Sequence, residues 1–151
     1  MTPIEFHVEV NVPAPPRLVW SVMTDVERWP EWTASVSRVQ RLSPGPLRPG
    51  SRVRIHQPKR PPAWWRVTGL EPDVGFTWVS IAPVVRVTAR HSVEATEGGS
   101  RATLSIRYEG SLGRWLARWV GSLNDRYLAM EAEGLKSRCT GLAAQPNACT
   151  L

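Results

Sequence analysis

A long amphipathic segment near the C-terminus limits the architectures open to this chain. Residues 112–138 place apolar side chains three and four positions apart, the spacing that gathers them on one face of a helix. Such a helix must bury its apolar face against another element, and the strand-like segments before it are the largest partner available. The apolar positions are Leu112, Leu116, Trp119, Val120, Leu123, Tyr127, Met130 and Leu135.

Seven segments have the composition of short β-strands. Residues 4–12 alternate apolar and polar side chains from Ile4 to Val12, the period of a half-buried strand. Breaks that contain Gly or Pro separate the six later segments, so we expect consecutive strands to pair antiparallel as a meander. These later segments are residues 36–42, 51–57, 63–70, 76–82, 85–96 and 101–110.

The chain between the first strand and the other six has a helical pattern. Residues 13–29 begin with prolines suited to a first helical turn and continue with apolar residues at helical spacing. Pro30 fits an N-terminal turn better than a helix interior. We therefore expect the first helix to pause near Trp29 and a second helical turn over residues 31–36.

The order of these elements predicts an α+β fold in one domain over residues 1–140, with residues 141–151 as a disordered tail. An antiparallel sheet of seven strands twists and curls, which makes one face concave. The long helix is the remaining element able to cover that face. A helix about 10 Å across does not fill the trough, so we expect a cavity beneath it.

The charge distribution indicates which partners to expect, and the cysteine positions indicate whether disulfides form. The formal net charge is +6, but the arginines are spread along the chain and mostly interleave with acids, apart from a cluster in residues 48–60. We therefore expect no nucleic-acid partner. Cys139 and Cys149 both lie close to the C-terminus, so we expect no disulfide framework.

The hydropathy pattern predicts no membrane insertion, because no run of about 18 consecutive apolar residues occurs. The first ten residues read straight into a strand rather than into an export signal. A cytoplasmic protein is expected, either a monomer or a homodimer.

His91 is the candidate catalytic residue. Strand parity puts it on the same face as Val87, Ala89, Val93 and Ala95, an otherwise apolar set that should face the cavity. A histidine there could act as a general acid or base, because its ordinary pKa lies near neutrality. The alternative is a structural histidine whose ring is satisfied by a neighbour.

Parity also predicts the side chains that face the cavity from the other strands, and the apolar stripe predicts those from the helix. Aromatic members of this set could stack on a planar ligand or simply fill the core. Asn124 and Tyr127 could orient an oxygenated ligand. The predicted ligand-binding residues are Val53, Ile55, Trp65, Val67, Phe76, Trp78, Ala89, His91, Val93, Leu104, Tyr108, Leu116, Val120, Leu123, Asn124 and Tyr127.

The sequence lacks the residue patterns that metal binding, phosphate binding and hydrolase chemistry require. His7, His56 and His91 fall on different predicted strands, and neither cysteine has a second ligand at zinc-like spacing. The sequence has no glycine-rich phosphate loop, no G-x-S-x-G elbow and no H-E-x-x-H helix. We expect no metal and no cofactor.

The segment from Pro16 to Trp32 carries a recognisable signature, in which the matching residues are Pro16, Val19, Trp20, Thr24, Asp25, Trp29, Pro30 and Trp32. This segment resembles the helix signature of the START-like or SRPBCC superfamily, which includes polyketide cyclases and dehydrases. The stretch of residues 97–110 that leads into the long helix is similar to the last hairpin of that superfamily. The resemblance implies a helix-grip fold over most of the chain, and members include cyclases, lipid carriers and hormone receptors.

Two functions remain open. The first is non-catalytic binding of a small hydrophobic molecule, such as a lipid or a polyketide, in the cavity. The second is a cyclase, aromatase or dehydrase that acts on a polyketide-like substrate, with His91 and a tyrosine moving protons. Binding is favoured because the predicted cavity contains no recognisable pair of acid and base. An RNA-associated role rests on the basic balance alone.

Overall fold

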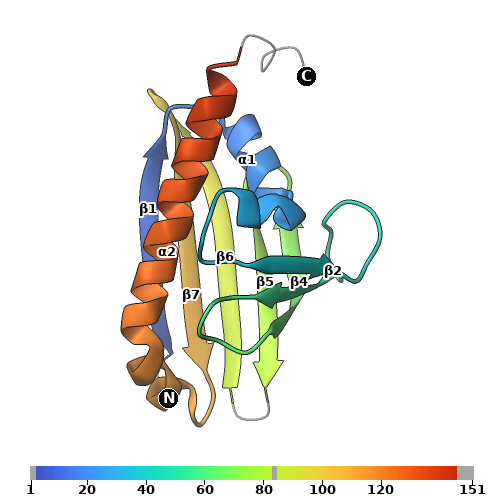
Figure 1. The fold of residues 1–151 in the computed structure, drawn as a ribbon, viewed down its shortest axis with the longest axis vertical. Helices are drawn as coiled ribbons and strands as arrows, with labels where there is room; N and C mark the ends of the chain where they lie inside the picture. Colours follow the sequence, from blue (N-terminus) through green and yellow to red (C-terminus); the bar gives the residue numbers. More distant parts are fainter. Residues whose placement is uncertain (1–2, 83–84, 146–151) are drawn as a thin grey trace.

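A computed structural model describes residues 3–82 and 85–145 and shows one seven-stranded antiparallel sheet with helices on a single face (Figure 1). The predicted α+β helix-grip architecture is confirmed. The elements are β1 (Ile4–Val12), α1 (Pro16–Thr24), η1 (Val26–Glu31), β2 (Arg38–Arg41), β3 (Arg52–His56), β4 (Ala63–Glu71), β5 (Gly75–Ala82), β6 (Val85–Thr96), β7 (Gly99–Glu109) and α2 (Gly113–Ala143).

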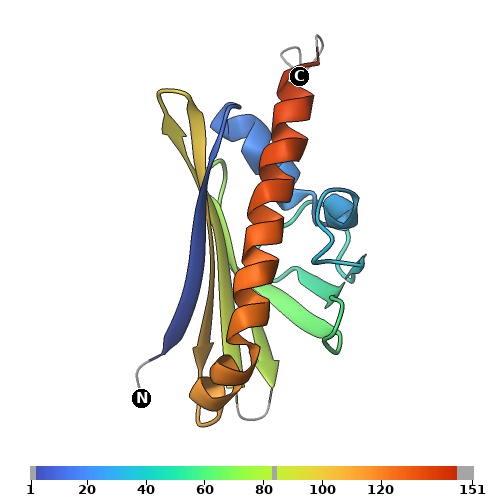
Figure 2. The same ribbon diagram turned by 60° about the vertical axis from the view of Figure 1, so that its left-hand side comes forward.

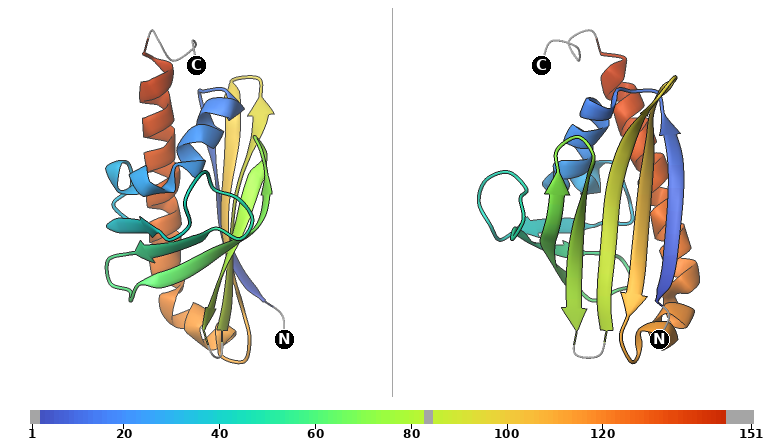
Figure 3. Two further views of the ribbon diagram at one scale, coloured as in Figure 1. Left: turned by 90° about the vertical axis from the view of Figure 1, so that its right-hand side faces the viewer. Right: turned by 180° about the vertical axis from the view of Figure 1, so that it is seen from behind.

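The sheet has the strand order β1-β7-β6-β5-β4-β3-β2. Strands β2 to β7 form the predicted meander, and β1 completes the sheet by pairing with β7. Strand register aligns interior side chains into rows, one of which crosses four strands through Val8, Leu104, His91 and Phe76. Figure 3 shows the sheet curving around α1, η1 and α2. This row faces the helices, because the Phe76 ring contacts Trp20 of α1 and the His91 ring contacts Trp29 of η1.

The predicted second helical turn over residues 31–36 is wrong. The short helix instead spans η1, a 3-10 helix that includes Pro30. The Thr33 hydroxyl accepts a hydrogen bond from the Ser35 backbone N–H at 3.3 Å and also bonds the Ser35 hydroxyl at 2.7 Å. These side-chain contacts compete with helical hydrogen bonds and hold the segment after η1 as a turn.

Helix α2 runs along the molecule and packs on β1, β7 and α1 (Figure 2). It continues to Ala143, beyond the predicted end at residue 138, and so includes the start of the segment expected to be a tail. The physical reason is burial, because Cys139 is fully buried and Leu142 packs against the core. Residues 146–151 of the predicted tail lie outside the described residues.

Gly134 allows α2 to approach the turn that follows η1. A Cβ atom at this position would lie 2.0 Å from the Trp32 carbonyl oxygen, far inside contact distance. The absence of a side chain therefore sets how closely the end of α2 sits over the N-terminal helices, and with it the depth of the space left above the sheet.

Candidate functional site

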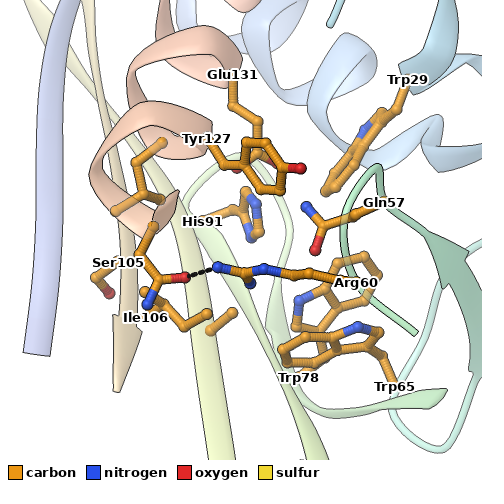
Figure 4. A pocket seen from close by; sticks show the side chains of 13 residues that line it. Trp29, Gln57, Arg60, Trp65, Trp78, His91, Ser105, Ile106, Tyr127 and Glu131 are labelled. Carbon is orange, nitrogen blue, oxygen red and sulfur yellow. Dashed lines mark hydrogen bonds between the residues drawn. The ribbon is translucent and has the colours of Figure 1, made fainter. Parts of the chain in front are cut away.

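A small cavity lies between the concave face of the sheet and the middle of α2 (Figure 4). Its volume is about 60 Å³. Side chains reach it from η1, from the segment between β3 and β4, from the central strands and from α2. The lining residues are Trp29, Gln57, Arg60, Trp65, Trp78, Ala89, His91, Ser105, Ile106, Asn124, Tyr127, Leu128 and Glu131.

The cavity occupies the predicted place but is much smaller than the sequence suggested. Its 60 Å³ suits a few water molecules, whereas pockets for drug-sized ligands measure about 300–1,000 Å³. Two features account for the difference. Aromatic rings fill much of the trough, and the side chain of Arg60 extends across the space from the segment between β3 and β4.

The aromatic wall is a cluster of rings in mutual contact. The Trp78 ring lies 5.4 Å from that of Trp29 and 5.6 Å from that of Trp65, measured between centroids. The Phe76 ring lies 5.2 Å from that of Trp78. The Trp78 ring plane is inclined by 60° to that of Trp29 and by 81° to that of Phe76, so the apolar surface is angular. Because Trp29, Trp78 and Phe76 are almost completely buried, the wall has little freedom to rearrange.

His91 belongs to this aromatic wall. Its imidazole stacks on the Phe76 ring with a centroid distance of 4.8 Å and an interplanar angle of 7°. Burial lowers the pKa of His91 from 6.5 to about 3, and its Nδ1 atom has no hydrogen-bond partner within the described part of the chain. The imidazole is therefore neutral at neutral pH, which makes His91 a poor proton donor there. Its catalytic role stays a prediction.

A polar network forms the opposite side of the cavity. The Asn124 amide nitrogen donates a hydrogen bond to the Tyr108 hydroxyl at 2.9 Å. The Arg60 guanidinium donates to the Asn124 amide oxygen at 2.5 Å and lies 5.1 Å from the centroid of the Tyr127 ring. The Tyr127 hydroxyl donates to the Pro58 carbonyl. Residues 58 and 60 are thereby tied to α2 from across the cavity.

Arg60 carries a charge that this network does not neutralise. Its hydrogen-bond partner Asn124 is a neutral amide, and its buried Nε atom has no partner within residues 3–82 and 85–145. A guanidinium stays protonated at any physiological pH, so a partly desolvated one with neutral contacts attracts an anionic or strongly polar oxygen. The cavity is electropositive on this side.

Glu131 is a buried acid that lines the same cavity as Arg60. Burial raises the pKa of Glu131 from 4.5 to about 7, while the positive charge of Arg60 acts in the opposite direction. Both the protonated and the ionised carboxyl are therefore present near neutral pH. A group with such a pKa is able to exchange protons with a bound molecule.

The structure places the sequence-predicted site residues in three groups. Six of them line the cavity: Trp65, Trp78, Ala89, His91, Asn124 and Tyr127. Seven are buried without lining it: Val53, Ile55, Val67, Phe76, Val93, Leu104 and Tyr108. The remaining three lie half-buried on the earlier turns of α2: Leu116, Val120 and Leu123. Whether any of these residues touches a ligand stays a prediction.

Two charged lining residues were absent from the predicted set. Glu131 had a detectable signal, because it lies four positions after Tyr127 and four before Leu135 and so interrupts the apolar stripe of the helix. Arg60 had none, since it lies in the Pro-rich segment between two strands and reaches the cavity only through the tertiary fold. Trp29 is part of the sequence signature, but no sequence pattern predicted that its side chain lines the cavity.

Within the described ranges, no three His, Cys, Asp or Glu side chains are grouped so that they could hold a metal ion. Over the same residues, no helix has the length and hydropathy needed to cross a membrane.

Comparisons with known proteins agree on the fold. The family described as polyketide cyclase/dehydrase and lipid transport matches residues 3–140. A search of curated proteins finds no match. Among solved structures, the Zhui aromatase/cyclase from Streptomyces sp. R1128 is 17% identical with a TM-score of 0.71, and the match covers 91% of this chain and 93% of that one.

Two further solved structures are similar over most of their length. A START superfamily protein from Mycobacterium smegmatis is 16% identical with a TM-score of 0.67, covering 90% of this chain and 97% of that one. A hypothetical protein from Helicobacter pylori is 14% identical with a TM-score of 0.75, covering 91% and 88%. At these identities, the likeness establishes the fold alone.

Proposed function

Because the chain belongs to the polyketide cyclase/dehydrase and lipid transport family, we propose that it binds a small, largely apolar molecule between its sheet and α2. The observation that carries this proposal is the two-sided cavity. One side is the wall of Trp29, Trp65 and Trp78, and the other presents Arg60 and Asn124. Apolar walls with a few convergent polar groups are typical of ligand sites.

Ligand entry requires Arg60 to move. The cavity of 60 Å³ is too small for a lipid or a polycyclic molecule, and Arg60 crosses it as a side chain from a connecting segment (Figure 4). Arg60 can leave without disturbing the strand ladders, because residues 57–62 lie between β3 and β4. A ligand oxygen that replaced Asn124 as the partner of Arg60 would offset the loss of that contact.

The chemistry of the two sides supports a ligand with an apolar part and an oxygenated part. The indole wall favours an aromatic or other hydrocarbon part, and the guanidinium favours a carboxylate, an enolate or a polarised carbonyl oxygen. A lipid with an acidic head or an oxygenated polyketide-like molecule has both parts.

The binding test uses a matched pair of fluorescent probes, anthracene-2-carboxylate and its methyl ester, titrated into the purified protein. We expect the carboxylate to bind more tightly than the ester. Arg60→Ala should weaken carboxylate binding by roughly tenfold or more, since a charge-assisted contact contributes about 1.5–3 kcal/mol. The same variant should leave ester binding unchanged or improved. Arg66→Ala, at an exposed position of β4, is the control. Equal binding of both probes to wild type and Arg60→Ala would refute the assignment.

Glu131 favours a second candidate function, a dehydrase or cyclase in the same cavity. Its pKa of about 7 would allow the carboxylate to remove a proton from a carbon next to a substrate carbonyl, while Arg60 pairs with the resulting enolate oxygen. A β-hydroxyl group would then leave and take the proton back from Glu131, which gives an alkene and water. Glu131→Gln should abolish turnover of such a substrate while retaining its binding. His91→Ala tests the catalytic role that the sequence predicts for His91.

A further inference from the structure

Exposed apolar side chains gather at one end of the molecule. Ile81, at the end of β5, is 77% exposed, and Trp119, in the second turn of α2, is 72% exposed. Leu112 and Trp115 are also exposed. Ile81 pairs with Arg86, which pairs in turn with Glu109 of β7, so the ends of these strands meet where α2 begins. Figure 2 shows this shared lower end.

We define the tryptophan surface as Leu112, Trp115, Arg118 and Trp119. The two indole rings lie 5.8 Å apart between centroids, and Arg118 lines the same shallow hollow. This surface faces away from the cavity, which is lined by α2 residues only from Asn124 onward. Neither indole contributes to the core, so the fold gives no reason for two tryptophans here.

The tryptophan surface carries a basic residue. Arg118 is exposed within it, and Arg86 is exposed next to Ile81 at the same end of the molecule, on the opposite face of the sheet from α2. Within the part of the chain that the structure describes, neither arginine has an ion-pair partner, while the nearby acid Glu109 is already paired with Arg107 at 3.2 Å. An anionic surface complements this arrangement.

We propose that the tryptophan surface docks the protein onto an anionic lipid bilayer. Indole rings are favoured at the bilayer interface, where an apolar body and a polar N–H meet both environments, and arginine pairs with lipid phosphates. A helix with this face lies in the interface plane and does not span the membrane. The patch contains only a few side chains, whereas a stable protein interface buries about 1,200–2,000 Å². Lipid is therefore the better occupant than a second copy.

Vesicle sedimentation tests this proposal with the full chain and without any cavity ligand. The vesicles are phosphatidylcholine alone or phosphatidylcholine with about one third phosphatidylglycerol. We expect binding to the anionic vesicles that weakens as salt is raised. The double variant Trp115→Ala/Trp119→Ala should bind at least about tenfold more weakly, because each ring would leave water for lipid. Arg118→Glu should reduce binding to anionic vesicles by a similar factor.

Trp64→Ala is the matched control, because Trp64 is 55% exposed and also lies beside an arginine, Arg54, with the guanidinium 5.2 Å from its ring centroid. This variant should bind vesicles like wild type.

Circular dichroism checks folding, and Trp119→Ser alone replaces the double variant if the latter is unfolded. Absence of binding to anionic vesicles, or equal binding by wild type and variant, overturns the proposal. The proposal is also overturned if the wild-type protein self-associates with increasing concentration and Trp119→Ser abolishes that self-association. Since the docking proposal goes beyond ligand binding, its failure leaves the cavity proposal standing.

Discussion

Replacement of Glu131 by glutamine isolates the energetic effect of the buried carboxyl. In the folded protein the pKa of Glu131 is raised from 4.5 to about 7 by burial. Between these two pH values the folded chain keeps a proton that the unfolded chain has released. The free energy of unfolding of the wild type should therefore fall as the pH rises through this window, and stay low above it. Glutamine has a similar shape and no charge, so the variant lacks this dependence.

The size of the effect follows from the same two values. A pKa of about 7 against 4.5 corresponds to about 3 kcal/mol, at about 1.4 kcal/mol per pKa unit. Glu131→Gln and wild type should differ little in the pH dependence of stability below pH 4.5. Relative to that baseline, the variant should gain up to about 3 kcal/mol by about pH 8.

Urea unfolding monitored by tryptophan fluorescence at a series of pH values from about 4 to 8 measures this difference. Glu133→Gln is the control, since Glu133 is an exposed acid on the same helix, and its curve should run parallel to that of the wild type. A constant offset between Glu131→Gln and wild type across the whole range would refute the reasoning. An advantage that shrinks with rising pH would refute it as well.

Other variants give independent checks. As the pH falls from 6.5 to 4 in an acid titration, the free energy of unfolding of the wild type should fall more than that of His91→Phe. The pKa of His91 is lowered to about 3 in the folded protein, so over this range the unfolded wild-type chain takes up a proton that the folded chain does not. Gly134→Ala should destabilise by about 1–3 kcal/mol in urea, since overpacking outweighs a helix-propensity gain of about 1 kcal/mol. Gly141→Ala, with open space around its Cβ position, should instead stabilise by up to about 1 kcal/mol. Cys139 should resist iodoacetamide in the folded protein, as followed by peptide mapping, because it is buried and its pKa is raised to about 12.

Short-range patterns predicted most of the fold. Alternation in the strands assigned His91, Leu104 and Phe76 to one face, and the register brings them into one row. The apolar stripe located α2 because a helix of this length needs an extended buried face. The errors lie at element ends, where a few local hydrogen bonds decide the outcome, as with Thr33 and Ser35 after η1.

The site was predicted less completely than the fold because its charged members depend on long-range contacts. Arg60 is separated by 64 residues from its partner Asn124, and nothing in the pattern around Arg60 indicates an interior position. The size of the cavity also depends on how several rings pack together, which parity cannot give. Strand parity tells which side chains point inward, but it does not tell whether they leave space.

The strongest argument for a ligand site lies in the chemistry of the interior rather than in its present volume. Arg60, His91 and Glu131 come from a connecting segment, a strand and a helix, yet all three line one cavity. Each is costly there, because burial opposes ionisation of His91 and Glu131 and the Arg60 charge has a neutral hydrogen-bond partner. Apolar side chains at these positions would stabilise the fold more. Interior residues that lower the stability of the fold are those expected to serve a bound molecule. The gain in the free energy of unfolding predicted for Glu131→Gln at high pH measures directly how much stability one of them costs.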